Sequence, residues 1–185
     1  MSYKLISDSC VDIPASLAKE LELEILPLKV TVKGKEYANY LDNREIKPEE
    51  FYNLLREENT ASTAQLNPND FVETFTPFLN AGQDILYLSF SSALSGTYNS
   101  SIIAKKQLSE EYPERNIVCL DTACASMGQG LLVTLAARKK LAGESLDEVK
   151  NYVEGIKLDI CHLFTVSDLG HLRRGGRLSA SSLVL

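Results

Sequence analysis

The chain has 185 residues and a mass of 20.5 kDa, the size of one large domain or of a domain and part of another. Hydrophobic residues make up 44% of it, which is enough for a sizeable core. Its 19 basic and 25 acidic residues leave a net charge of −6. This balance argues against a general binder of nucleic acid or anionic membranes, because phosphate binding needs clustered positive charge.

Strands and helices are predicted to alternate along the chain. The first half of the chain is predicted to contain a strand at Tyr3–Ser7, a helix at Ala15–Leu21, a strand at Ile25–Val32, a turn at 33–35, a helix from Pro48 and a loop at 58–68. A helix opened by Pro68, a strand at Asp84–Phe90, a helix from near Ser95 to about Ser109 and a strand at Asn116–Leu120 are predicted next. The last predicted elements are helices at Met127–Leu141 and Ser145–Ile156 and a strand at Leu163–Val166. This alternation predicts a three-layer α/β fold with helices on both faces of a mainly parallel sheet.

Two domains are expected. Residues 1–160 are predicted to form an N-terminal α/β region that carries the candidate site, and residues 161–185 to begin a second α/β domain. Ser181–Leu185 look like the start of a further element, so we expect this second domain to be incomplete in the chain.

Features of membrane and secreted proteins are missing from the sequence. No apolar run reaches the roughly 18 residues of a membrane span, and the first five residues hold no apolar signal core. The cysteines form no C-x-x-C pair; they are Cys10, Cys119, Cys124 and Cys161. Reduced thiols in a cytoplasmic protein are therefore expected.

Metal and nucleotide sites have little support. His162 and His171 are the two histidines, and no cysteine stands at ligand spacing to either, so no metal site is predicted. Gly128-Gln129-Gly130 lacks the third glycine of a dinucleotide fingerprint. Close helix packing is the better explanation of these glycines, and no cofactor is expected.

An enzyme is the alternative to a binding protein. Asp8, Cys124 and Ser95 are the candidate catalytic residues of a small-molecule hydrolase or phosphotransferase. Such a nucleophile needs a nearby base, and neither histidine is close in sequence to these residues. Asp8 is better explained as a hydrogen-bonding residue after the first strand.

The hydroxyl-rich segment Ser91–Thr97 is the most informative feature. It follows a buried strand, where ligands bind in parallel sheets, and it opens a helix whose first amides favour an anion. Capping of that helix by Ser92 or Ser95 is the simpler explanation. A second hydroxyl-rich segment, Ser62–Gln65, shifts the balance, because two such segments without acidic residues suggest an uncharged cradle for an anionic head group.

In combination, these segments resemble the DegV family of bacterial fatty-acid-binding proteins. The resemblance rests on Ser7-Asp8-Ser9, Thr63-Ala64-Gln65, Leu88–Tyr98, Asp121 with Ser126-x-Gly128-x-Gly130, and Asp168–Ser179, which occur in the family's order over essentially the whole chain. Two departures are Ala64 and Leu66, where the family has serine and proline in Thr-Ser-Gln-Pro. Family members are also about half again as long.

The resemblance implies a two-domain protein that binds a long-chain fatty acid and is not itself an enzyme. It implies that Ser62 and Thr63 contact the carboxylate from one side, and that Ser92, Ser95 and Gly96 do so from the other. A separate ATP-dependent fatty acid kinase would phosphorylate the bound acid, and Arg177 would engage that kinase or the phosphorylated product. A nucleic-acid contact by this arginine segment fits the net negative charge poorly, whereas docking to an acidic partner surface fits it.

Overall fold

This computed structural model describes residues 2–57, 60–163, 165 and 175–176. Their strands form two β-sheets. The larger sheet has four parallel strands in the order β2-β1-β6-β7. Their bounds are Glu24–Leu26 (β2), Tyr3–Asp8 (β1), Asp84–Ser89 (β6) and Ile117–Asp121 (β7).

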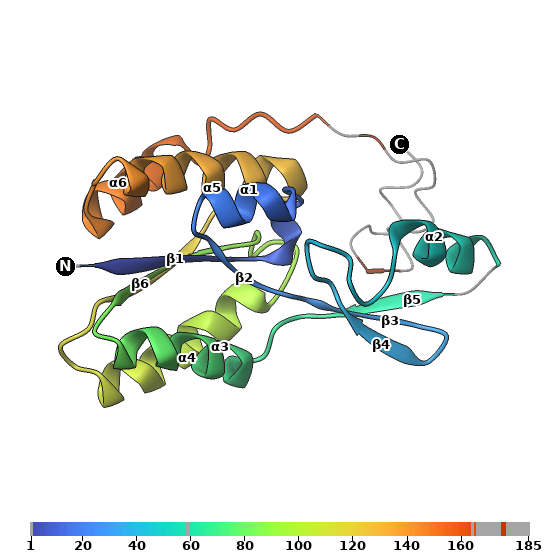
Figure 1. Ribbon diagram of the computed structural model, residues 1–185, viewed down its shortest axis with the longest axis horizontal. Coiled ribbons are helices and arrows are strands. Elements are labelled where there is room, and N and C mark those ends of the chain that lie inside the picture. Colours follow the sequence, from blue (N-terminus) through green and yellow to red (C-terminus); the bar gives the residue numbers. More distant parts are fainter. Residues whose placement is uncertain (1, 58–59, 164, 166–174, 177–185) are drawn as a thin grey trace.

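Helices cover both faces of the parallel sheet (Figure 1). On one face lie α1 (Ala15–Glu20), α5 (Ser126–Leu141) and α6 (Leu146–Ile156), and on the other lie α3 (Pro68–Asn80) and α4 (Thr97–Glu111). A short 3-10 turn, η1 (Ser9–Val11), connects β1 to the segment before α1. The predicted three-layer α/β arrangement is confirmed.

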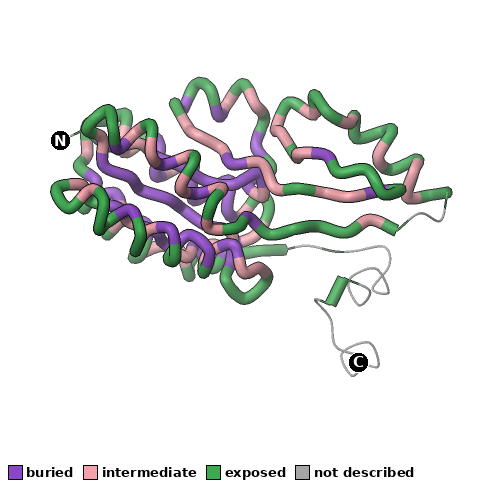
Figure 2. The backbone as a smooth tube through the Cα atoms, turned by 90° about the horizontal axis from the view of Figure 1, so that it is seen from below, coloured by how far each residue is buried: buried purple, intermediate pink, exposed green. Residues whose placement is uncertain are grey.

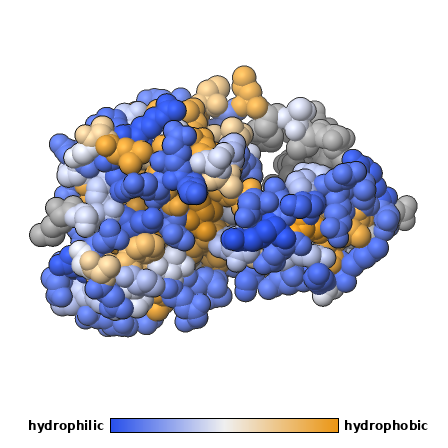
Figure 3. Space-filling view, in the orientation of Figure 1, coloured by the Kyte–Doolittle hydropathy of each residue, from blue (hydrophilic) through white to orange (hydrophobic). Residues whose placement is uncertain are grey.

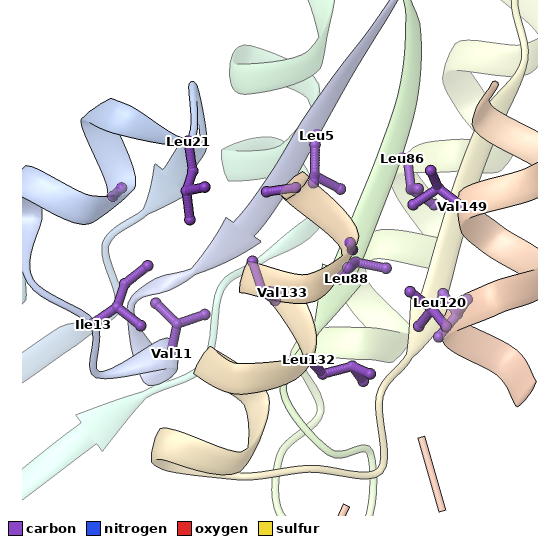
Figure 4. Close-up of a cluster of buried hydrophobic side chains, with 14 of the residues drawn as sticks. Leu5, Val11, Ile13, Leu21, Leu86, Leu88, Leu120, Leu132, Val133 and Val149 are labelled. Atoms are coloured by element: carbon purple, nitrogen blue, oxygen red, sulfur yellow. The ribbon is translucent and has the colours of Figure 1, made fainter. Parts of the chain in front are cut away.

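Successive residues of β6 enter two separate cores. Leu86 and Leu88 pack with α5 and α6 (Figure 4), whereas Ile85 and Tyr87 pack with α3 and α4. Side chains alternate across a strand, so a strand covered on both faces is apolar on both sides, as Ile85–Leu88 of β6 are. Figure 2 shows the resulting band of buried backbone through the middle of the parallel sheet.

Capping sequences begin two of these helices. Ser145 accepts a hydrogen bond from the Glu148 amide, and the Glu148 side chain accepts one from the Ser145 amide, which forms a capping box at the start of α6. Asn67 and Asp70 form a second capping box at the start of α3.

The smaller sheet is antiparallel, with strand order β4-β3-β5. It contains β3 (Lys29–Val32), β4 (Lys35–Ala38) and β5 (Ala61–Ala64), and α2 (Pro48–Arg56) lies between β4 and β5 in sequence. The predicted turn is confirmed: Lys33 and Gly34 both have positive φ, 51° and 74°, as a two-residue type I′ hairpin requires.

Two predictions in this region were wrong. The single strand expected at Ile25–Val32 divides at Pro27 into β2 and β3, which belong to different sheets, because proline supplies no amide to a ladder. The loop expected at 58–68 contains β5. Its residues Ala-Ser-Thr-Ala carry no strand pattern, so pairing with β3 decides their conformation.

The predicted second domain at 161–185 lies almost wholly outside the described residues. Leu163 and Thr165 are not in a strand, and the other residues of the predicted strand Leu163–Val166 are not described. Among the described residues, no helix is both long and apolar enough to cross a membrane.

Candidate functional site

The carboxyl ends of β1, β6 and β7 meet at one edge of the parallel sheet. These strands end at Asp8, Ser89 and Asp121, and β6 continues into the hydroxyl-rich segment 91–97. In parallel sheets this edge is where ligands bind. The fold therefore places the strongest sequence motif at the position that the sheet topology favours.

Asp8 organises the interior of this edge. It is fully buried, and its Oδ2 accepts hydrogen bonds from the Tyr87 hydroxyl (2.8 Å) and the Phe90 amide (2.9 Å). Its Oδ1 accepts from the Cys10 amide (3.1 Å) and from Nε2 of Gln129 (3.2 Å). Asp8 thus ties the end of β1 to the start of the segment after β6, and its predicted hydrogen-bonding role is confirmed.

Burial changes the ionisation of this cluster. It raises the pKa of the Asp8 carboxyl above its ordinary value, although the bonds from Phe90, Tyr87 and Gln129 oppose the shift. Burial, followed by the charge of Asp8, raises the pKa of Tyr87 well above its ordinary value. Tyr87 therefore remains a neutral donor to the carboxylate.

Ser92 is engaged by an acidic residue. Its amide donates to Oδ1 of Asp121 at 3.2 Å, and its hydroxyl donates to Oδ2 of the same carboxylate. Asp121 also accepts from the Ala123 amide at 2.9 Å. Neither of the two hydroxyl-rich segments contains an acidic residue, but the fold places Asp121, at the end of β7, against Ser92.

Ser95 lies at the start of α4, which begins at Thr97, two residues later than predicted. The Ser95 hydroxyl accepts from the Thr97 amide at 3.2 Å and lies 3.0 Å from the Thr97 hydroxyl. Gly96 holds the capping position itself, with no side-chain bond, and Ser92 bonds to Asp121 instead. The simple capping explanation therefore applies to Ser95 in part and does not apply to Ser92.

The two hydroxyl-rich segments lie side by side although about 30 residues separate them. The Leu66 amide, just after β5, donates to the hydroxyl of Thr97 at 3.4 Å. The Gln65 side chain lies directly against Gly96. Leu66 is itself buried among Phe71 and Phe75, which anchors the end of β5 beside α4.

Ser62 and Thr63 point to opposite faces of the antiparallel sheet. Thr63 pairs with Val30, which also pairs with Tyr37, so these three share one face. Ser62 pairs with Thr31 on the other face. Because neighbouring side chains in a strand alternate, this geometry separates the two hydroxyls that the family resemblance assigned to the same side of a head group.

Exposed hydrophobic side chains accompany the polar segments. Leu94 is 39% exposed, Met127 in the first turn of α5 is 61% exposed, and Leu131 one turn later is 50% exposed. Most of the remaining apolar residues of α5 pack into the core.

Two hollows lie away from the hydroxyl-rich segments. The larger, of about 290 Å³, is lined by α1, β2 and residues 40–44, in the region where Figure 3 shows hydrophobic surface in the middle of the view. The other, of about 250 Å³, is lined by residues 9–14 and 39–43. Among the described residues, no candidate site residue lines either hollow.

The glycines at the start of α5 pack closely, as predicted. A β-carbon at Gly130 would lie 2.8 Å from Cγ2 of Ile13 and closer still to the Val11 carbonyl oxygen. Gly128 similarly makes room for the ring of His162, whose Nε2 accepts from the Ala125 amide at 3.4 Å. Among the described residues, no group of three metal-ligating side chains comes together.

Cys124 is poorly suited to nucleophilic chemistry. Its side chain is buried and lies 3.8 Å from the Lys157 carbonyl oxygen. Burial raises the pKa of its thiol, which disfavours the reactive thiolate.

Three side chains at this edge had no individual role in the sequence-based site. Asp121 and Gln129 belong to the motifs quoted for the resemblance, but their bonds to Ser92 and Asp8 depend on the fold. For Gln65, the sequence offers one indication of a role in the site, which is its position two residues after Thr63. Arg177, predicted to engage the kinase or the phosphorylated product, lies outside the described residues.

Comparison with known proteins gives a consistent family. Residues 2–185 match the family model described as "Uncharacterised protein, DegV family". A DegV domain-containing protein of Clostridium perfringens is 46% identical over 183 residues, which cover 99% of this chain and 62% of the relative. The chain thus spans less than two thirds of that protein's length.

Solved structures agree in fold. A Thermus thermophilus DegV family protein, described for its fatty acid binding, superposes with a TM-score of 0.85 at 32% identity, covering 100% of this chain and 64% of that one. A stearic acid-binding protein from Eubacterium ventriosum has a TM-score of 0.82 at 25% identity, covering 97% of this chain and 63% of its own. This chain belongs to the DegV family.

Proposed function

We propose that the chain forms the head-group-binding part of a protein that binds a long-chain fatty acid. The observation that carries the proposal is the meeting of β5 with the segment before α4, through Leu66–Thr97 and Gln65–Gly96. This meeting brings Thr63 and Ser95, two of the proposed carboxylate ligands, to neighbouring segments. The fatty acid binding described for the Thermus thermophilus protein supports the same ligand class.

The proposed head-group site uses neutral donors. A carboxylate beside the first turn of α4 would meet backbone amides and the positive end of the helix dipole. Thr63 and Ser95 would add hydroxyl donors. Gly96 would take part through its backbone amide, because the Gln65 carboxamide occupies the space where a side chain would stand. Asp121 holds the Ser92 amide, so the Ser92 hydroxyl can turn to the ligand while the segment stays in place. Ser62 faces away from Thr63 and would contribute only through the opposite face of the sheet.

The acyl chain would supply most of the affinity. Burying each methylene contributes about 0.8 kcal/mol, whereas a neutral hydrogen bond contributes about 0.5–1.5 kcal/mol. Leu94, Met127 and Leu131 expose apolar surface on segments that begin at the same sheet edge. They are the proposed first contacts of the acyl chain.

Binding rather than catalysis is the proposed activity, with no cofactor. The rival hydrolase or phosphotransferase would use Asp8, Cys124 or Ser95. Asp8 is buried with four hydrogen bonds, and Cys124 is a buried thiol with a raised pKa. Both residues are better suited to structural roles than to attack on a substrate.

The proposal includes presentation of the bound acid to a separate fatty acid kinase. This part rests on the motif resemblance, in which Arg177 engages the kinase or the phosphorylated product. A cytoplasmic location is part of the same proposal, and the four cysteines, which are free thiols in the structure, support it.

Native mass spectrometry of the intact protein purified from bacterial cells tests the binding proposal. We expect a bound mass equal to that of a fatty acid, and a loss of that mass in Thr63→Val. Thr31→Val is the matched control, because Thr31 lies in the paired strand on the opposite face. An intact protein that never carries or takes up an acyl mass would refute the proposal.

Coupling to the kinase needs a separate measurement. In a reaction with purified kinase, ATP and oleate, Arg177→Glu is expected to retain the bound acid but lose acyl phosphate formation. Unchanged phosphate formation would remove the role proposed for Arg177.

A further inference from the structure

Gly96 has no conformational need to be glycine. Its dihedral angles are φ −74° and ψ 0°, an ordinary right-handed helical conformation that every L-residue adopts. It is not among the residues with positive φ. The reason for a glycine at this position must therefore be the space around it.

That space is filled by one carboxamide. A β-carbon at position 96 would lie 2.8 Å from Cδ and 2.9 Å from Nε2 of Gln65, and closer still to Oε1. All three atoms belong to the end of the Gln65 side chain. The glycine makes room for this amide group at the point where α4 begins.

The backbone around Gln65 is held on both sides. The preceding residue, Ala64, pairs with Lys29 in the antiparallel sheet. The following residue, Leu66, is buried and its amide donates to the hydroxyl of Thr97. The backbone therefore presents the Gln65 side chain to Gly96 from a fixed point, between the strand that carries Thr63 and the helix that follows Ser95.

We propose that Gln65 is a positioning residue, which acts by docking its carboxamide on Gly96 and so sets the relative placement of Thr63 and Ser95. The inference rests on the proposed function, because its consequence is the affinity for a fatty acid carboxylate. Two hydroxyls on separate segments can bind one carboxylate well only when their spacing is preorganised. Gln65 and Gly96 provide that spacing across the boundary between the two sheets.

A double-mutant cycle tests the pair. In the intact protein, Gly96→Ala places a methyl group in the position of the Gln65 amide, and Gln65→Ala removes the amide. Each single variant is expected to weaken binding of oleate about tenfold, an effect of the size of one lost hydrogen bond. The double variant should bind no worse than either single variant, because the methyl group then fits the space that the amide has left.

Matched controls separate this effect from general damage. Gly155→Ala adds a methyl group on α6 where no atom lies within 4 Å, and Gln107→Ala removes an exposed amide from α4. Both should bind oleate as the unmodified protein does. The thermal unfolding midpoints of Gly96→Ala and Gln65→Ala should stay close to that of the unmodified protein, since the displaced group is the end of a flexible, exposed side chain.

A measurement without ligand keeps the inference independent of the proposed function. Amide hydrogen exchange at Leu66 should be faster in both single variants, because loosening the contact weakens the bond from Leu66 to Thr97. Unchanged exchange together with unchanged oleate affinity would overturn the inference. If the unmodified protein binds no fatty acid, the proposed function fails, while faster Leu66 exchange would still support the Gln65–Gly96 contact.

Discussion

The two sheets differ sharply in how deeply their strands are buried. All six residues of β6 in the parallel sheet are buried, whereas Val32 and Tyr37 are the buried residues of β3, β4 and β5 together. The parallel sheet also has helices on both faces, while β5 is a four-residue edge strand. One part of the candidate site therefore lies on the densely packed parallel sheet, and the other part lies on the antiparallel sheet, whose strands are mostly not buried.

The two parts of the site therefore differ in how firmly they are held. Ser92 and Ser95 follow β6, whose position is held by two cores and by Asp8. Thr63 lies on β5, whose placement depends on pairing with β3 and on the few contacts around Gln65 and Leu66. Adjustments of the site to different ligands are expected to occur on the antiparallel side, since local stability follows the number of buried apolar contacts.

Truncation of a core side chain in each sheet gives the largest expected contrast. Leu88→Ala removes a fully buried side chain of β6 and should lower the free energy of unfolding by about 2–5 kcal/mol. Val30→Ala removes a half-buried side chain of β3 and should lower it by about 1 kcal/mol or less. Urea unfolding measures both values, and equal losses would contradict the comparison.

A methyl group added to a glycine tests the close packing of α5 on the scaffold. Gly130→Ala should destabilise the protein by about 1–3 kcal/mol, because the neighbouring Val11 carbonyl belongs to the backbone and cannot move freely. Gly155→Ala, on open α6 surface, should stabilise it by about 0.5–1 kcal/mol through helix propensity. Changes of the same sign in the two thermal melts would show that Gly130 is not tightly packed.

The buried carboxyl of Asp8 should make the stability of the protein depend on pH. Burial raises its pKa in the folded protein, so its contribution to stability is complete below its unfolded pKa and is lost as the pH rises through the folded pKa. The free energy of unfolding should therefore fall as the pH rises from the unfolded to the folded pKa.

Carboxyl-carbon NMR measures this titration directly. The midpoint of Asp8 in the folded protein should lie above 3.8, the ordinary aspartate value, and should return towards that value in urea. A folded midpoint at or below 3.8 would show that the four hydrogen bonds outweigh burial.

Local patterns predicted much of the scaffold. The strand β6, the helix opened by Pro68 and the helix α6 all appear at or near their predicted places. Each of these signals depends on neighbours within a few residues. The strand Ala61–Ala64 was missed because its conformation depends on pairing with β3, a partner that the local pattern does not identify.

The order of amino acids was sufficient to predict the alternation of strands and helices, the family resemblance and the residue types of a neutral head-group site. Which of those residues meet depends on the folded arrangement. It places Asp121 on Ser92, separates Ser62 from Thr63 across a sheet, and brings Gln65 against Gly96. Periodicity and capping act over one or two turns of chain, whereas these contacts join residues that strand order and core packing bring together.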